Sequence, residues 1–305
     1  MHRNISGPVS ALAIVAALFS THAIAQTLPD VAPPPPIKHS PVNPHRYEDG
    51  SLRRGLRNEV MTQNWSGYAL ANFQTAVSAY TQTRASWIVP QVSYVPLSGN
   101  SANWEYSSSW AGIGGYCENS SCTAVDNTLI QLGTDADVSS TGATYYVAWY
   151  EMLPNYAIPL PNPIGPGDYI VASLVCVANC SASKVQTWRL GMSDIAAKNS
   201  GRSSWNWSKN FQYQTTMLSA EWIEEAPWLN TIVPLGNYAT LGVGSIYVNN
   251  VTATLQLNTN GIAMEDPWGQ TSNPAAPLRG SAFSACWGSG TTLTPCTTQP
   301  INPPK

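Results

Sequence analysis

Short segments in which polar residues alternate with apolar or aromatic ones make up most of the chain from Asn64 onward. Two of them are NWSGYAL (64–70) and VSAYTQTRASWIVP (77–90), and stretches rich in Gly, Pro, Asn and Ser separate such segments from one another. Period-2 alternation is typical of strands with two unlike faces, and this spacing of turns is typical of antiparallel sheets. The sequence therefore predicts an all-β fold, an antiparallel β-sandwich or barrel.

Further strands are expected along the rest of the chain, with irregular loops at 192–219 and 260–280. The expected strands are Asn103–Ile113, Thr128–Gly133, Thr144–Met152, Asp168–Ala178, Thr187–Met192, Ala220–Glu224, Ile246–Val248, Ala253–Leu257 and Ser281–Trp287.

The distribution of charge excludes some functions. Charged residues are 10% of the chain, against about 25% in average soluble domains. From Met61 onward there are 8 basic and 13 acidic residues, a net charge of −5. Because binding to phosphates requires a basic face, we expect no nucleic-acid partner.

Histidine is confined to the first 45 residues, at positions 2, 22, 39 and 45. The domain after residue 60 therefore cannot build a Ser-His-Asp or Cys-His site by itself. A His-ligated zinc site would also need the N-terminal segment. We expect no metal or other cofactor, and acid–base chemistry is left to carboxylates.

The N-terminal 60 residues divide into two parts. Residues 1–25 have a basic start, an apolar run at Val9–Phe19 and a small-residue pattern before Gln26, which predicts a cleaved secretory signal. Residues 26–60, here called the leader, carry the run VAPPPPIK (31–38) and five basic residues. The leader is either a linker or a propeptide whose basic groups pair with the acidic domain 61–305 and block it. We expect a secreted protein, extracellular or periplasmic, with no membrane segment after cleavage, and a monomer.

The six cysteines lie in three close pairs, and a secreted chain favours disulfides. Local pairing is the simplest of fifteen possible connectivities. The expected pairs are Cys117 with Cys122, Cys176 with Cys180, and Cys286 with Cys296.

Gln131 is a neutral amide among apolar residues in the strand-like stretch NTLIQLGTD (127–135). Alternation places Leu129, Gln131 and Gly133 on one face. A buried amide without partners costs about 1–3 kcal/mol, so this side chain is either a satisfied core residue or a donor aimed at a developing oxyanion.

Three carboxylate-bearing stretches are candidates for acid–base chemistry: 131–135, YYVAWYE (145–151) and AEWIEEAP (220–227). In a strand, Glu221 and Glu225 share one face and Glu224 takes the other. Periodicity alone does not choose between Glu221 and Glu225. A carboxylate among aromatic residues is desolvated, which raises its pKa and suits it to acid–base work in acid.

Six motifs in order resemble the glutamic peptidases, or eqolisins, which are secreted endopeptidases that act in acid. The resemblance covers most of residues 64–287, and it implies a concanavalin-like jelly roll of two packed sheets with its cleft on a concave face. The motifs are NWSGY (64–68), WIVP (87–90), SWAGIGG (109–115), LIQLGTD (129–135), AWYE (148–151) and AEWIEE (220–225).

The resemblance also implies roles for individual residues. The family's catalytic glutamine corresponds to Gln131, and its catalytic glutamate corresponds to Glu225. Supporting or cleft-lining residues correspond to Trp65, Trp110, Asp135, Trp149 and Glu151.

The chain departs from the family pattern at two positions. Gly114 stands where the family's GIDG turn has an acid, and Val147 stands where an aspartate is expected before AWYE.

The resulting hypothesis is hydrolysis of polypeptide substrates, with Glu225 activating a water and Gln131 donating to the oxyanion. The leader is a possible inhibitor of this activity. The alternatives are a glycan-binding module, a glycosidase of the same architecture that uses two of Glu151, Glu221 and Glu225, and a secreted structural protein whose site is inactive.

Overall fold

The computed structural model describes residues 33–73, 80–97, 103–289 and 296–303. The expected signal segment and residues 26–32 of the leader lie outside the described residues. The described part contains seventeen strands and one helix of four residues, α1 (Leu257–Asn260). The strands are β1 (Val60–Thr62), β2 (Trp65–Ala71), β3 (Gln82–Ile88), β4 (Trp104–Glu105), β5 (Ser108–Gly114), β6 (Leu129–Ser139), β7 (Thr144–Met152), β8 (Ile158–Pro159), β9 (Tyr169–Ala178), β10 (Gln186–Ile195), β11 (Trp205–Tyr213), β12 (Ser219–Glu225), β13 (Thr240–Val248), β14 (Val251–Thr252), β15 (Gly261–Glu265), β16 (Gln270–Pro274) and β17 (Phe283–Ser289).

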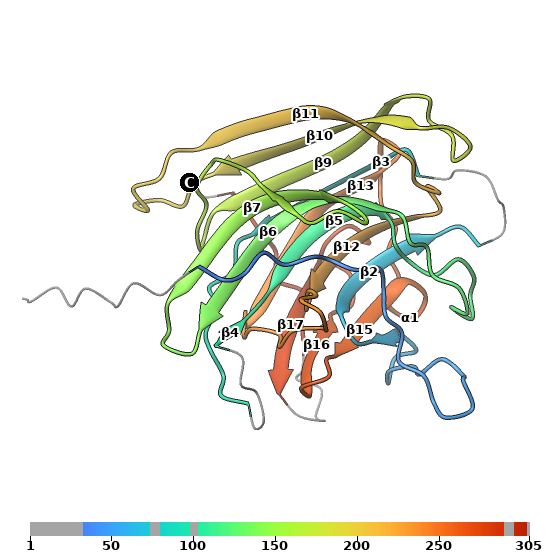
Figure 1. The fold of residues 1–305 in the computed structure, drawn as a ribbon, viewed down its shortest axis with the longest axis horizontal. Helices are drawn as coiled ribbons and strands as arrows, with labels where there is room; N and C mark the ends of the chain where they lie inside the picture. Colours follow the sequence, from blue (N-terminus) through green and yellow to red (C-terminus); the bar gives the residue numbers. More distant parts are fainter. Residues whose placement is uncertain (1–32, 74–79, 98–102, 290–295, 304–305) are drawn as a thin grey trace, which may run out of the picture. The chain divides into compact units, whose positions relative to one another are not determined.

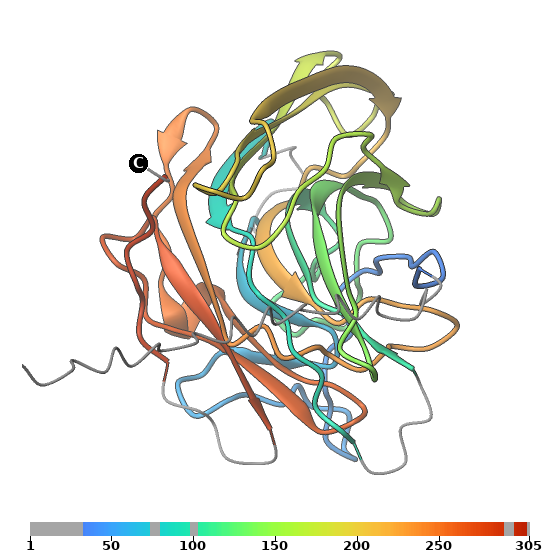
Figure 2. The same ribbon diagram turned by 90° about the vertical axis from the view of Figure 1, so that its left-hand side faces the viewer.

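The strands form one ladder that folds back on itself. Its order is β8-β7-β6-β5-β12-β2-β15-β16-β17-β13-β3-β9-β10-β11, and every one of these pairings is antiparallel. Figure 1 shows β9, β10 and β11 lying above β5, β6 and β7, and Figure 2 shows the same two halves after a 90° turn. The prediction of an all-β antiparallel sandwich is confirmed.

The main hydrophobic core lies between the two halves of the ladder. Ile130 and Leu132 of β6 pack there with Trp222 of β12, and Trp188 and Leu190 of β10 face them from the other half. Each of these side chains is buried, and burial of one such side chain contributes about 1.5–3 kcal/mol. Since side chains alternate along a strand, the odd-numbered neighbours in β6 point to the opposite face.

Two predicted loops contain strands, and one predicted strand is absent. The stretch 192–219 holds β11, and 260–280 holds β15 and β16. β11 is an edge strand whose exposed residues Asn206, Ser208 and Asn210 alternate with aromatic ones, and Lys209 interrupts this pattern. The expected strand Ala253–Leu257 is irregular up to α1, because the chain turns after β14.

The three local disulfides were predicted correctly: Cys117–Cys122, Cys176–Cys180 and Cys286–Cys296 are all bonded. They fasten short connections rather than joining the two halves of the sandwich. In the described residues, no helix has the length and hydropathy that a membrane crossing requires.

Candidate active site

The second face of the sheet β2-β12-β5-β6-β7 carries the predicted site residues. Gln131 of β6 is paired in register with Glu151 of β7, and Glu225 of β12 is paired with Ser108 of β5, which is paired with Asp135. All four polar residues of the prediction, Gln131, Asp135, Glu151 and Glu225, are buried. The strand register therefore places these four residues on one face of the sheet.

Glu225 has donors on both of its carboxyl oxygens. The Trp110 indole Nε1 donates to Oε2 at 2.8 Å, and the Ser40 backbone N–H donates to Oε1 at 3.1 Å. Burial raises the pKa of Glu225 to about 8, although His39 and these two donors act in the opposite direction. With the leader in place, burial therefore favours the protonated form of this carboxyl group, and each of its oxygens accepts one hydrogen bond.

Gln131 presents its amide nitrogen to the same part of the face. Nε2 donates to Glu151 Oε2 at 2.8 Å, whereas the amide Oε1 is buried without a hydrogen-bond partner. The hydrogen bond to Glu151 is thus the contact that orients the Gln131 amide group. It directs the amide nitrogen, which is the donor, toward the carboxyl group of Glu151.

Asp135 is held by two donors and supports the surrounding aromatic residues. Trp149 Nε1 donates to Oδ1 at 2.7 Å, and Ser108 Oγ donates to the same oxygen at 2.6 Å. Gly133 lies between Gln131 and Asp135, and a Cβ there would come within 2.6–2.7 Å of the Trp110 and Trp149 side chains. The glycine of LIQLGTD is thus required by the close packing of two indoles across the strand.

The leader crosses this face of the sheet (Figure 1). Its residue His39 is fully buried, and its imidazole stacks on the Trp149 ring with centroids 3.8 Å apart and planes at 18°. His39 Nδ1 lies 2.9 Å from Glu151 Oε2, and the His39 backbone N–H donates to the same oxygen at 3.2 Å. His39 Nε2 lies 3.6 Å from Asp135 Oδ1, which is longer than a hydrogen bond.

The charge of the site is carried by His39. Burial on its own would lower the pKa of His39, but the attraction of Glu151 and Asp135 outweighs it and raises that pKa well above 6.5. The buried imidazole is therefore cationic at neutral pH, and it faces carboxyl groups from three strands, β6, β7 and β12. Sequence reasoning missed this residue, because it treated histidine as absent from the domain and sought docking groups among the arginines.

The backbone on both sides of His39 is also fastened to the sheet domain. The backbones of Lys38 and Trp228 exchange two hydrogen bonds, of 3.0 and 2.8 Å. Trp65 Nε1 donates to the Ser40 carbonyl at 3.1 Å, and Val42 N–H donates to the Gly115 carbonyl at 2.9 Å. The leader thus occupies the site in an extended form, like a bound peptide.

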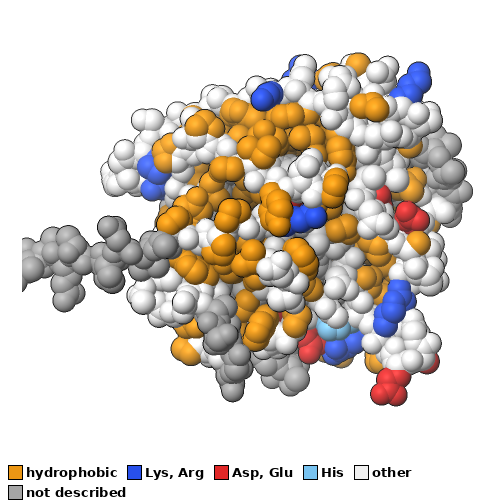
Figure 3. Space-filling view, viewed as in Figure 1, with side chains coloured by type: hydrophobic (Ala, Val, Ile, Leu, Met, Phe, Trp, Pro, Cys, Tyr) orange, Lys and Arg blue, Asp and Glu red, His pale blue; other side chains and the backbone are white. Residues whose placement is uncertain are grey.

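The basic residues of the leader contribute little to this docking. Among the described residues, one of its five cations pairs with an acid of the sheet domain, Arg53 with Glu265 at 2.9 Å. Both side chains are partly exposed, and such surface pairs are worth about 0–1 kcal/mol. On the face drawn in Figure 3, hydrophobic side chains gather and acidic ones are few, because the acids of the site are buried beneath.

Both departures from the eqolisin pattern have a structural counterpart. Gly114 has φ +90°, and the side chain of Asp126 lies 3.1 Å from where its Cβ would be. Asp126 therefore places a carboxylate beside the turn at Gly114, where the family pattern has an acid and this chain has glycine. Val147 lines a hollow of about 150 Å³ together with Asp135, Trp149 and leader residues 34–37, so an apolar surface replaces the expected acid.

Glu221 and Glu225 lie on the same face but differ in their surroundings. Glu221 is aligned through Gly112 with Gln131, and burial raises its pKa well above 4.5. Glu225 accepts a hydrogen bond from the leader, through the backbone N–H of Ser40. This contact favours Glu225 as the group that meets a bound peptide, which the alternation of side chains did not decide.

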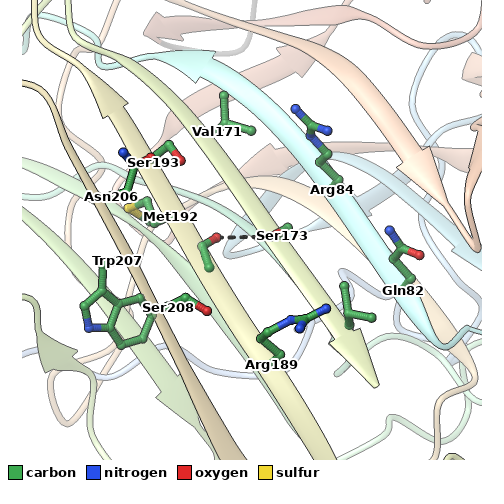
Figure 4. A pocket seen from close by; sticks show the side chains of 12 residues that line it. Gln82, Arg84, Val171, Ser173, Arg189, Met192, Ser193, Asn206, Trp207 and Ser208 are labelled. Carbon is green, nitrogen blue, oxygen red and sulfur yellow. Dashed lines mark hydrogen bonds between the residues drawn. The ribbon is translucent and has the colours of Figure 1, made fainter. Parts of the chain in front are cut away.

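Two hollows outside the buried cluster differ in character. One of about 250 Å³ lies beside leader residues 38–41, against Leu153 and Trp228, so the cleft is wider than the leader that fills it. A larger one, about 580 Å³, lies on β3, β9, β10 and β11 (Figure 4). The residues lining this larger hollow include two arginines and no carboxylate, so it cannot supply a carboxylate base.

Residues 63–273 match the family model described as the Peptidase A4 family, and the chain belongs to that family. It is 27% identical over 217 residues to Aspergillopepsin-2 of Aspergillus niger, covering 66% of this chain and 67% of that protein. No solved structure gives a significant match.

Proposed function

We propose that this protein is a secreted endopeptidase acting in acid, with Glu225 as general base and Gln131 as oxyanion donor. The ionised Glu225 carboxylate takes a proton from a water, which attacks the scissile carbonyl. The Gln131 amide donates to the oxyanion that forms, and protonated Glu225 then passes its proton to the leaving amine. Trp110 orients Glu225, and Glu151 orients Gln131.

The observation that carries this proposal is the way consecutive leader residues meet the two groups. Ser40 N–H contacts Glu225, while His39 contacts Glu151, the carboxyl group that holds the Gln131 amide. Two consecutive backbone N–H groups of the leader therefore contact Glu225 and Glu151, and Glu151 is the carboxyl group that holds the Gln131 amide. An oxyanion donor contributes about 2.7–4 kcal/mol to transition-state stabilisation, and an ordinary glutamate titrates near about 4.3, so acid operation follows.

We also infer that residues 26–60 are an inhibitory propeptide and that residues 1–25 direct secretion. The inhibitory role is supported by the hydrogen bond from the Ser40 backbone N–H to Glu225 Oε1 and by the burial of His39 against Glu151. While the leader is bound, it competes with a substrate for these two contacts. Three disulfides in the described chain agree with an oxidising compartment.

The test is hydrolysis of a denatured protein substrate in acid, with and without pepstatin. The full chain is compared with its Glu225→Gln and Gln131→Ala variants. Matched controls are Glu118→Gln and Gln212→Ala, which alter exposed side chains. We expect hydrolysis that pepstatin does not stop, a loss of at least 100-fold in both site variants, and little change in the controls.

A His39→Ala chain is assayed beside them, so that a persistently docked leader is not mistaken for an inactive site. Wild-type rates in either site variant would exclude the mechanism. Absence of hydrolysis in both the wild-type and the His39→Ala chains would exclude the activity.

A further inference from the structure

We propose that Trp149, Asp135 and Glu151 form a subsite that selects a flat, cationic side chain of the substrate. The peptidase would then cleave beside histidine or arginine in preference to neutral residues. This inference rests on the proposed function, because it assigns a substrate preference to the same cleft.

The first support is the fit of His39 in this pocket. Its ring lies parallel to the Trp149 indole at 3.8 Å, and its Nδ1 is within 2.9 Å of Glu151. A planar cation over an indole face gains both stacking and cation–π attraction. The pocket therefore recognises a shape and a charge at once, which an aliphatic or neutral aromatic side chain cannot provide together.

The second support is the charge that remains when the leader is absent. Among the described residues, His39 is the only cation within ion-pair distance of Asp135 or Glu151. Without the leader, two carboxyl groups would share a pocket with no basic residue of the sheet domain to neutralise them. A cation from the substrate would take the place of His39.

The third support is a carboxylate oxygen of Asp135 that lies beyond hydrogen-bond distance of the His39 imidazole. Among the described residues, His39 Nε2 has no hydrogen-bond partner, and it lies 3.6 Å from Asp135 Oδ1. The hollow of about 150 Å³ lined by Asp135 and Trp149 lies beside this gap. A guanidinium on a longer stem, with its fork of N–H donors, could reach both carboxyl groups. Arginine should therefore be favoured at least as strongly as histidine.

The position of the pocket along the substrate follows from the backbone contacts. The residue after His39 donates its N–H to Glu225, and its carbonyl accepts from Trp65. A side chain in the pocket thus belongs to a residue that adjoins the bond nearest Glu225. In the leader itself, the Ser40 N–H already donates to the Glu225 oxygen that Trp110 does not contact, so the leader backbone competes with the attacking water for that oxygen.

The test uses the full chain incubated in acid with a peptide library in which every residue is varied around a mapped cleavage site. We expect basic residues to be enriched at one position adjoining the cut bond. A matched pair of peptides then carries arginine or its neutral, planar analogue citrulline at that position. The arginine peptide should have at least tenfold higher kcat/KM, and Asp135→Asn should reduce this ratio severalfold. Glu265→Gln, which removes the acid paired with Arg53, should leave the ratio unchanged.

A second measurement does not depend on catalysis. Hydrogen exchange of the Ser40 amide in full-length chains reports whether the leader remains docked. His39→Arg should keep the protection, and His39→Leu should lower it at least tenfold. Cleavage without a basic preference, or equal protection in His39→Leu and wild type, would overturn the subsite while leaving the peptidase intact. Absence of all cleavage in both the wild-type and the His39→Ala chains would instead refute the proposed function.

Discussion

Replacing His39 by alanine should convert a latent full-length protein into one that is active from the first moment of the assay. The substitution removes a charged hydrogen bond to Glu151, worth about 1.5–3 kcal/mol. It also removes the stacking contact with Trp149, worth about 0.5–1.5 kcal/mol. A loss of about 3 kcal/mol changes the ratio of open to closed cleft by roughly 150-fold, since about 1.4 kcal/mol corresponds to a factor of ten.

The assay is the initial rate of hydrolysis of a quenched fluorescent peptide, recorded before any change in the length of the chain is visible on a gel. The matched control is His45→Ala, because His45 also lies in the leader but contacts the Glu265 backbone carbonyl instead of the site acids. We expect a large initial rate for His39→Ala and a lag for the wild type and for His45→Ala. Equal lags in all three proteins would refute the assignment of His39 as the residue that closes the cleft.

Three further predictions concern the site and its turn. Trp110→Phe removes a donor that lowers the pKa of Glu225, so the acid limb of the pH–rate profile should move to higher pH and kcat should fall about tenfold or more. Binding of the synthetic peptide 33–48 to an open His39→Ala chain should weaken as the pH rises above 6.5, because docking beside Glu151 and Asp135 raises the pKa of the peptide's own His39 and so takes up a proton that is less available at higher pH. Titration calorimetry should show up to about tenfold weaker binding per pH unit, equivalent to about 1.36 kcal/mol per proton; pH-independent binding would contradict it. Gly114→Asp places a Cβ against a buried backbone carbonyl and should lower Tm more than Gly142→Asp, which has a similar positive φ but open space; equal Tm values would show that the turn tolerates the side chain.

Much of the site geometry follows from the alternation of side chains along strands. Gln131 and Glu151 each lie between apolar residues that face the core, so their direction away from it could be predicted. Glu225 follows Glu224, which is itself buried, so polarity did not mark the direction of Glu225. The choice between Glu221 and Glu225 could not be predicted either, because both have the same parity in β12. The resemblance to the eqolisins favoured Glu225, and the contact with Ser40 supports that choice.

The path of the leader could not be predicted, because it follows no period. Residues 33–59 contain isolated bridges instead of named strands, and the bridge nearest to His39 joins Lys38 to Trp228, which is distant in the sequence. Counting charges directed attention to the arginines, yet the deepest contact is made by His39. The relevant signal was a histidine that closely follows a proline run, in a chain that has no histidine after residue 45.

The edge strand β11 was missed for a different reason. Its outward residues are polar because solvent covers them, and its inward residues include Lys209 beside the aromatic ones. Alternation is clearest in a strand whose residues are buried on one face and exposed on the other along its whole length. In β11 only some residues of the inward face are buried. The pairing with β10 defines the strand, and such pairing is not visible in a single segment.

The location of the disulfides determines the fate of the leader once the connection between leader and domain is cut. Each bond joins residues within the domain, and the leader contains no cysteine. While the chain is intact, tethering gives the leader a local concentration of the order of millimolar. After a single cleavage only its intrinsic affinity remains, so dilution into a large volume would empty the cleft, and a concentrated solution would keep it filled.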